Sequence, residues 1–191
     1  MGADWSDFWD EEIPRIEFDP ERYEKPAEPY YREVELVRIY TARELCVRPY
    51  PGHPRGCPNY GKKVGCPPGM PFVEDIIDVR KQTFVIWNRF DLGLHIARMR
   101  QRHPEWSERQ VRCCRYWQGT ARSRLYELLG FFSFEHPGMA IVECPEATGV
   151  DVTATMSRIA IDLEWPPMKW AYQVLVAGHR LERRWSHGLK I

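Results

Sequence analysis

Short apolar runs separated by helical patterns are the main feature of this chain. Residues 84–90 (Phe-Val-Ile-Trp-Asn-Arg-Phe) form a nearly continuous apolar run, which is typical of a buried strand. Residues 139–144 and 171–177 have the same character, and residues 33–40 begin with alternating polar and apolar positions. Together these runs predict a central sheet of about four or five strands.

Apolar residues at helical spacing occupy the segments between the expected strands. One such segment begins with Ser107 and Gln110 in the Ser-x-x-Gln form of a capping box, and Asp151 is a candidate N-cap for another. The helices expected from these patterns span residues 73–81, 91–101, 107–132 and 151–160. Because helices alternate with strands, the predicted fold class is α/β or α+β, with helices flanking the sheet.

Residues 45–71 differ in kind from the rest of the chain. Seven of the 16 prolines fall in this segment, together with five glycines. Neither a helix nor a central strand runs through that density of Pro and Gly. A loop of this length is unusual inside a compact domain unless it is functional or tied down. Three of the six cysteines lie in it, namely Cys46, Cys57 and Cys66.

The three loop cysteines, spaced Cys46-x10-Cys57-x8-Cys66, predict a metal centre. Thiolates are the ligands that iron in clusters and zinc prefer. A proline-rich loop loses less entropy on becoming ordered around a metal, because its unfolded ensemble is already narrow. Nearby bases favour thiolate over thiol; these are Arg48, Arg55, Lys62 and Lys63. We expect a [4Fe–4S] cluster held by three thiolates, with the fourth iron open or bound by a remote ligand.

Several residues are candidates for a fourth ligand. Cys144 is favoured because it ends an expected strand just before Pro145, and Cys113 is a second candidate. His53 lies inside the loop and would instead complete a Cys3His zinc site, although the paired cysteines of common zinc sites are missing. Cys114 falls on the apolar stripe of the helix expected over residues 107–132, so we expect it in the core.

Two stretches of sequence resemble a known family. The run Cys57-Pro-Asn-Tyr-Gly-Lys-Lys-Val-Gly-Cys66-Pro-Pro is similar to the signature of small prokaryotic predicted metal-binding proteins of uncharacterised function. Residues 145–155 (Pro-Glu-Ala-Thr-Gly-Val-Asp-Val-Thr-Ala-Thr) resemble a second segment of that family. The family typically has a Cys-x-x-Cys group before this segment, whereas this chain has only Cys113-Cys114 and Cys144. The resemblance implies metal or iron–sulfur binding and no particular reaction.

Charge is distributed unevenly along the chain. Residues 1–30 contain ten acidic and three basic residues, a net charge of −7, with aromatic residues interleaved. We expect them to form an acidic arm ahead of one domain over residues 31–191. Residues 95–124 contain eight arginines against two glutamates, a net charge of +6. This segment suits nucleic acid, which makes a zinc-stabilised nucleic-acid-binding module the alternative function, but the near-cancellation of the two charges favours pairing with the arm.

Other properties narrow the class of protein. The formal net charge is zero, which argues against a general coating by nucleic acid. No apolar run is long enough to span a bilayer, and the first residues lack the features of a secretory signal. We therefore expect a cytoplasmic protein in which cysteines serve as ligands or reactive thiols. The expected partners are a small-molecule substrate or a redox partner, and no membrane.

Overall fold

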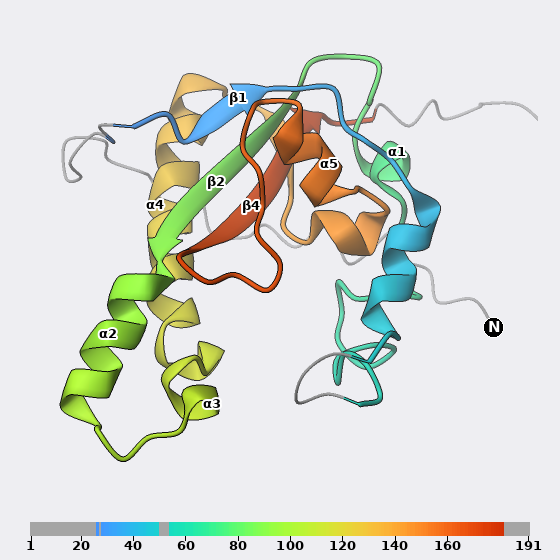
Figure 1. Ribbon diagram of the computed structural model, residues 1–191. Helices are drawn as coiled ribbons and strands as arrows, with labels where there is room; N and C mark the ends of the chain where they lie inside the picture. The colour runs from blue at the N-terminus through green and yellow to red at the C-terminus, as the bar shows by residue number, and fades with distance from the viewer. Residues whose placement is uncertain (1–25, 27, 50–53, 182–191) are drawn as a thin grey trace, which may run out of the picture.

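The computed structural model describes residues 26, 28–49 and 54–181. Its centre is a four-stranded antiparallel sheet with the order β1-β2-β4-β3 (Figure 1). The strands are β1 (Tyr31–Glu33), β2 (Thr83–Asp91), β3 (Met139–Val142) and β4 (Trp170–His179). Mixed helices around an antiparallel sheet make this an α+β fold, which confirms the predicted class.

Helix α4 (Gln118–Glu135) covers one face of the sheet. Its buried Leu128 and Phe132 pack against Phe84 and Ile86, which are alternate residues of β2. Side chains at alternate positions of a strand point to the same face, so these two β2 residues form one half of its apolar run. The other half, which includes Val85 and Trp87, faces the opposite layer.

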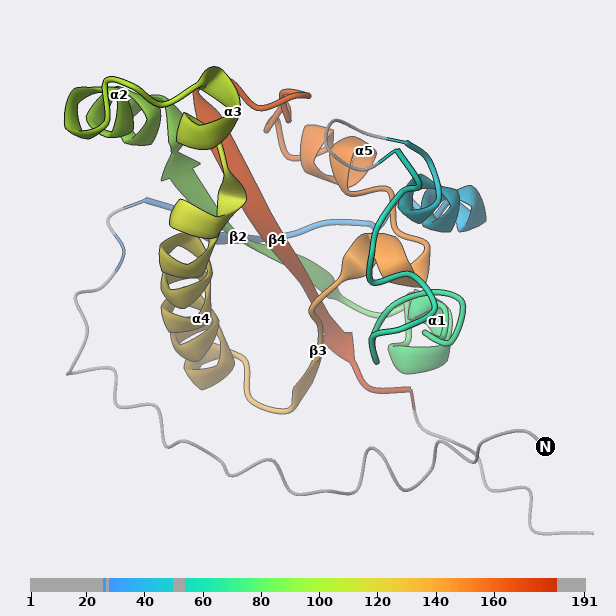
Figure 2. The ribbon, with the colours of Figure 1, turned by 90° about the horizontal axis from the view of Figure 1, so that it is seen from below.

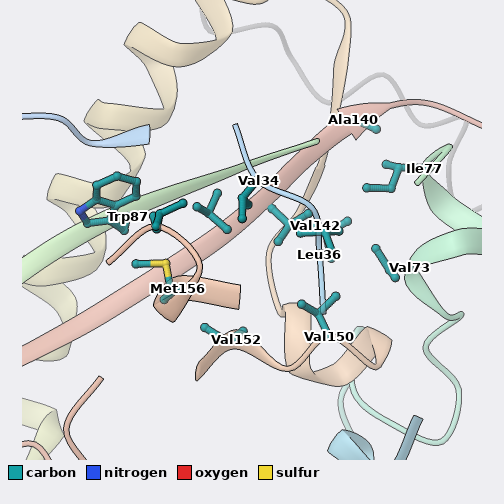
Figure 3. Close-up of a cluster of buried hydrophobic side chains, with 13 residues drawn as sticks. Val34, Leu36, Val73, Ile77, Trp87, Ala140, Val142, Val150, Val152 and Met156 are labelled. Carbon is teal, nitrogen blue, oxygen red and sulfur yellow. The ribbon is translucent and has the colours of Figure 1, made fainter. Parts of the chain in front are cut away.

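The second layer consists of short helices and connecting segments. They are α1 (Val73–Ile76), the 3-10 helix η5 (Pro145–Thr148) and α5 (Val152–Ser157). Figure 3 shows the cluster that these elements form on the sheet. Val73, Val150 and Met156 are fully buried in it. The sheet is therefore covered on both sides, which explains why β2 is apolar at consecutive positions.

A separate lobe extends from the end of β2 and β4, at the lower left of Figure 1. It contains α2 (Leu92–Arg102), α3 (Glu108–Val111) and the 3-10 helix η4 (Cys114–Tyr116). A small core joins the lobe to the sheet; its buried residues are Leu92, Ile96, Val111 and Ala171. We call residues 92–124 the arginine lobe, because the eight arginines of residues 95–124 lie in it.

Helix starts follow local signals. The Asp91 carboxylate accepts a hydrogen bond from the Leu94 N–H at 2.8 Å, and Asp151 does the same for Ala154 at 2.9 Å. At the start of α3, the Gln110 side chain accepts from the Ser107 N–H at 3.0 Å. These bonds satisfy N–H groups that have no partner within the first turn of a helix.

The prediction of one continuous helix over residues 107–132 is wrong for the first half of that range. The chain forms α3, η4 and α4 instead, with Cys113 extended and Trp117 outside helical geometry. Trp117 stacks on Phe90 with ring centroids 5.1 Å apart, and its Nε1 donates to the Arg112 carbonyl. Tertiary packing of a large aromatic side chain therefore interrupts the periodic pattern. Cys114, expected in the core, is exposed.

Two other expected elements are shorter than their patterns suggest. Of residues 33–40, only the first position belongs to β1, and Arg38 forms an isolated bridge with Val150. Of residues 73–81, only the first turn is helical. Within the described part of the chain, no helix combines the length and apolar character needed to cross a membrane.

Candidate metal centre

The 3-10 helix η3 (Tyr40–Cys46) leads into the cysteine loop and ends at its first cysteine. The Cys57 N–H donates to the Cys46 carbonyl at 2.7 Å. Gly56 has a φ of +77°, and a Cβ there would lie 2.6 Å from the Cys46 carbonyl oxygen and 2.8 Å from the Val47 Cα. Only glycine permits this crossing of two backbones, which makes the first two loop cysteines neighbours.

A compact series of turns returns the chain to this crossing. The Tyr60 N–H donates to the Cys57 carbonyl at 3.2 Å, and the Cys66 N–H donates to the Lys63 carbonyl at 3.1 Å. The Gly61 N–H donates to the Pro67 carbonyl at 2.8 Å, which joins the two ends of the turn series. The backbone is thus organised by hydrogen bonds without helix or strand, as the density of Pro and Gly predicts.

The Cys46 thiol lies within electrostatic reach of the other two loop thiols. Burial raises the pKa of the Cys46 thiol, and the thiols of Cys57 and Cys66 raise that pKa further. Because Coulomb interactions weaken with distance, this coupling requires proximity. All three cysteines are free and half-buried. Cys57 and Cys66 therefore both lie within the range of an electrostatic interaction with Cys46.

The second resemblance segment docks against the loop. The Ile39 N–H donates to the Gly149 carbonyl at 2.8 Å, and the Asp151 N–H donates to the Val37 carbonyl at 2.8 Å. This pairing places η3 in contact with η5. In Figure 2, the teal loop follows η3 and leads to α1. The second resemblance segment thus pairs with the stretch of chain that leads into the cysteine loop.

Cys144 immediately precedes η5, as its N-cap residue. Burial raises the pKa of its thiol; the charges of Glu146 and Cys66 raise it further, and the charge of Lys63 lowers it. The residue nevertheless keeps exposed surface. Cys144 therefore stands beside the loop cysteines at a position that water still reaches.

Glu146 is a site residue that the sequence reasoning did not assign. Burial raises the pKa of its carboxyl, partly opposed by its own backbone N–H, and the charge of Asp151 adds to the rise. The residue as a whole is exposed to solvent. Its carboxyl nevertheless has enough protein around it for burial to dominate the pKa. Its charge raises the pKa of both Cys46 and Cys144, so it lies within electrostatic reach of each thiol. The Glu-Ala pair of residues 145–155 was the signal that pointed to it.

Arg43 anchors the end of the loop to η3. Its guanidinium donates to the Met70 carbonyl and lies 3.7 Å from the centre of the Phe72 ring. Burial lowers the pKa of Arg43, while the charge of Cys46 is among those that raise it. Its buried Nε has no hydrogen-bond partner among the described residues. The end of the loop thus contacts a half-buried cation within electrostatic reach of the Cys46 thiol.

The remaining predicted candidates do not join the site. Cys113 and Cys114 belong to the arginine lobe, which both Figure 1 and Figure 2 show well apart from the cysteine loop. This separation removes Cys113 as a fourth ligand. His53 and most of the expected acidic arm over residues 1–30 lie outside the described residues.

In the parts of the chain that the structure describes, no group of three or more His, Cys, Asp or Glu side chains is arranged to hold a single metal ion. The thiols are neighbours without forming the closed shell that one ion requires. Comparison with protein families, curated proteins and solved structures finds no match for this chain.

Proposed function

We propose that the protein holds one [4Fe–4S] cluster through Cys46, Cys57 and Cys66. The observation that carries this proposal is the electrostatic coupling of Cys46 to the other two loop thiols, one of which is linked to it by a backbone crossing that only glycine permits. A cluster is larger than one ion and separates its ligands more widely. Since no group of three or more metal-ligating side chains is arranged to hold an ion among the described residues, the proposal rests on the spacing of the three cysteines and on the crossing beside two of them.

The charges around the thiols support the same assignment. Thiolates bound to an iron–sulfur cluster carry net negative charge, which nearby cations offset. Arg43 is half-buried within electrostatic reach of Cys46, and Lys63 lies close enough to Cys144 to lower its pKa. Metal binding requires deprotonated sulfur, so the raised pKa of the Cys46 thiol implies that loading of the site releases protons and is favoured by alkaline pH.

The role of the cluster depends on its fourth iron. If Cys144 binds that iron, the site suits electron transfer or structural support. If the iron stays open, it supplies a Lewis acid for a small substrate. Glu146, whose charge reaches Cys144 and whose carboxyl has a raised pKa, would then be the residue able to hold a proton near such a substrate.

Metal and sulfide analysis of protein purified without oxygen tests the proposal. We expect brown protein absorbing near 400 nm, with about four irons and four sulfides per chain for a [4Fe–4S] cluster. Cys57→Ala and Cys66→Ala should lose the cluster, whereas Cys114→Ala, an exposed cysteine of the lobe, should keep it. Cys144→Ala should keep the iron but change the electronic spectrum if Cys144 is the fourth ligand.

Colourless protein with stoichiometric zinc would contradict the iron–sulfur assignment and support the alternative zinc site. Loss of iron in Cys114→Ala to the same extent as in Cys57→Ala would also contradict it, because the loss would then reflect a general effect of cysteine removal.

The arginine lobe supports a second candidate function, nucleic-acid binding. Trp106 stacks on His103 with centroids 4.0 Å apart and lies 4.9 Å from the Tyr116 ring. Exposed aromatic rings and arginines together are typical of single-stranded nucleic-acid sites. Five exposed lobe arginines form no ion pair with any described residue; they are Arg98, Arg102, Arg109, Arg115 and Arg122.

Fluorescence anisotropy with a labelled 20-nucleotide RNA tests this second function. Binding should weaken steeply between 50 and 200 mM salt, by about tenfold or more if several phosphates are contacted. Arg98→Gln with Arg102→Gln should weaken it further, while Lys62→Gln in the cysteine loop should not. A response that is flat with salt would remove this function.

A further inference from the structure

A cleft of about 340 Å³ lies on the sheet, away from both the cysteine loop and the arginine lobe. Its lining comes from β1 and the residues just before it, from β2 and β4, and from the segment that follows α5. Small-molecule sites typically occupy about 300–1,000 Å³, so the cleft is large enough for a small ligand. No residue of the proposed metal centre lines it.

The register of the sheet places four of the lining side chains on one face. Arg32 of β1 lies opposite Val85 of β2, and Tyr172 of β4 lies opposite Arg89. Residues at alternate positions of a strand share a face, as do directly opposite residues of paired strands, so Trp87 and Arg89 lie on the same face as Arg32 and Tyr172. Trp87 stands at one end of the buried cluster in Figure 3. Aromatic and cationic side chains therefore meet on this surface.

The turn that follows α5 supplies the other wall of the cleft. Ala160 has a φ of 61°, in the left-handed region, and the Ile161 N–H donates to the Met156 carbonyl at 3.1 Å. This reversal of the chain is a common ending of helices, although glycine usually occupies the left-handed position. It brings the apolar Ile159 and Ile161 and the carboxylate of Asp162 to the cleft.

The cleft contains two arginines and two carboxylates, and half of this charge is already paired. The Arg89 guanidinium donates to both carboxylate oxygens of Glu28, at 3.0 and 2.8 Å. Arg32 forms no ion pair with a described residue, and its guanidinium donates to a backbone carbonyl at a long 3.4 Å. Asp162 also forms no ion pair within the described chain, and it accepts a hydrogen bond from the Ser157 hydroxyl at 3.2 Å. One cation and one anion are therefore available to a ligand.

We propose that this cleft binds a free amino acid with an apolar or aromatic side chain. The guanidinium of Arg32 pairs with the ligand's carboxylate, for which its planar fork is well suited. The carboxylate of Asp162 accepts from the ligand's ammonium group, and the ligand's side chain lies against Trp87 and Tyr172. A ligand with only one of the two charges leaves the other protein group unpaired, so the cleft selects a zwitterion. This inference does not depend on the metal centre.

Isothermal titration calorimetry of the full chain with L-phenylalanine tests the proposal. We expect one site with a Kd below about 1 mM. 2-Phenylethylamine lacks the carboxylate and 3-phenylpropionate lacks the ammonium group, so each should bind at least about tenfold more weakly. L-Alanine keeps both charges but has little apolar surface to bury, and it should also bind at least about tenfold more weakly.

Substitutions in the cleft identify the group that recognises each end of the ligand. Arg32→Gln and Asp162→Asn should each lower the affinity for L-phenylalanine at least about tenfold. Asp162→Asn should also abolish the preference for L-phenylalanine over 3-phenylpropionate, a change that a merely structural role would not produce. The matched control is Arg38→Gln, an exposed arginine that does not line the cleft, and it should leave the affinity within about twofold. The thermal midpoint of each variant without ligand separates loss of folding from loss of binding.

Three outcomes overturn this assignment. The first is no heat of binding and no rise in thermal midpoint with L-phenylalanine or L-leucine at about 10 mM. The second is binding of 3-phenylpropionate as tight as that of L-phenylalanine, which would mean that the ammonium group is not recognised. The third is an equal loss of affinity in Arg38→Gln and Arg32→Gln, which would place the ligand elsewhere. None of these measurements depends on iron content, so the proposed function is tested separately.

Discussion

The cysteine loop and the arginine lobe are both rich in basic residues, but they are held together by different forces. The lobe has helices and a core of its own, centred on the fully buried Val111. Over residues 45–71 the loop buries only Gly56 and Pro67 among its described positions, and backbone hydrogen bonds organise it. Apolar burial stabilises the lobe, whereas the loop lacks that source of stability and suits a segment completed by a bound group.

The two regions also use their cations differently. In the lobe, Arg100 and Arg112 both contact Glu108, and Arg124 pairs with Glu127, so part of the charge is neutralised within the lobe. In the loop, the cations lie near thiols or face solvent. Part of the cationic charge is therefore paired within one region, while cations of the other remain exposed.

Disrupting the backbone crossing should have the largest effect. Gly56→Ala puts an alanine in the left-handed region of backbone conformation and places its Cβ 2.6 Å from the Cys46 carbonyl oxygen. The backbones at Cys46 and Cys57 must therefore separate. We expect iron content to fall at least about fivefold, since strained backbone positions cost about 1–3 kcal/mol and this one also clashes. Gly61→Ala is the control, because it has a similar φ and no atom within 4 Å of its Cβ. Equal iron content in both variants would contradict the proposed role of the crossing.

Removing buried apolar volume from the lobe should lower its stability without affecting the loop. Val111→Ala deletes two methyl groups from a fully buried side chain and should cost about 2 kcal/mol in the free energy of unfolding. Urea denaturation followed by circular dichroism measures this cost. Iron content should remain at the wild-type value, and a parallel loss of iron would mean that the two regions are not independent.

The N-caps of the two regions provide a matched pair of substitutions. Asp91→Ala removes the cap of α2 in the lobe, and Asp151→Ala removes the cap of α5 beside the proposed centre. Each should cost about 1 kcal/mol in the free energy of unfolding. Only Asp151→Ala should alter the metal centre, because its charge raises the pKa of Glu146. A changed electronic spectrum in Asp91→Ala would contradict this distinction.

The smallest expected effect concerns the ion pairs of the lobe. Hydrogen bonds from Arg112 and Arg100 lower the pKa of Glu108 below its ordinary value. The carboxylate therefore stabilises the folded state above the unfolded pKa of about 4.3, and this contribution is lost as the pH falls through the folded pKa. Glu108→Gln should flatten the decrease in thermal midpoint between about pH 4.5 and 3. An unchanged slope would show that these exposed pairs contribute nothing measurable.

Local signals predicted much of the fold. The apolar run of residues 84–90 lies within β2, and the runs at 139–144 and 171–177 contain most of β3 and β4. Helix α2 (Leu92–Arg102) is shifted by one residue from the expected segment 91–101, and the expected N-cap Asp151 precedes α5. These elements were predictable because strand burial and first-turn capping depend on a few neighbouring residues.

Periodicity failed where distant contacts decided the conformation. The stripe from Val111 to Phe132 has helical spacing, but stacking of Trp117 on Phe90 interrupts the helix and leaves Cys114 exposed. Helix η3 was not predicted either. Its start coincides with the pairing of Ile39 and Gly149, a contact that no local pattern encodes.

The sequence by itself determined the character of the cysteine loop. Prolines and glycines exclude regular structure between residues 45 and 71, and the same segment supplies three thiols and a basic surface. Only the tertiary structure decided what stands beside those thiols. Backbone pairing of residues 37–39 with 149–151 brings Cys144 and Glu146 to the loop across more than 75 intervening residues. Such pairing depends on how the sheet and its covering layer close around a shared core, and spacing along the chain does not reveal it.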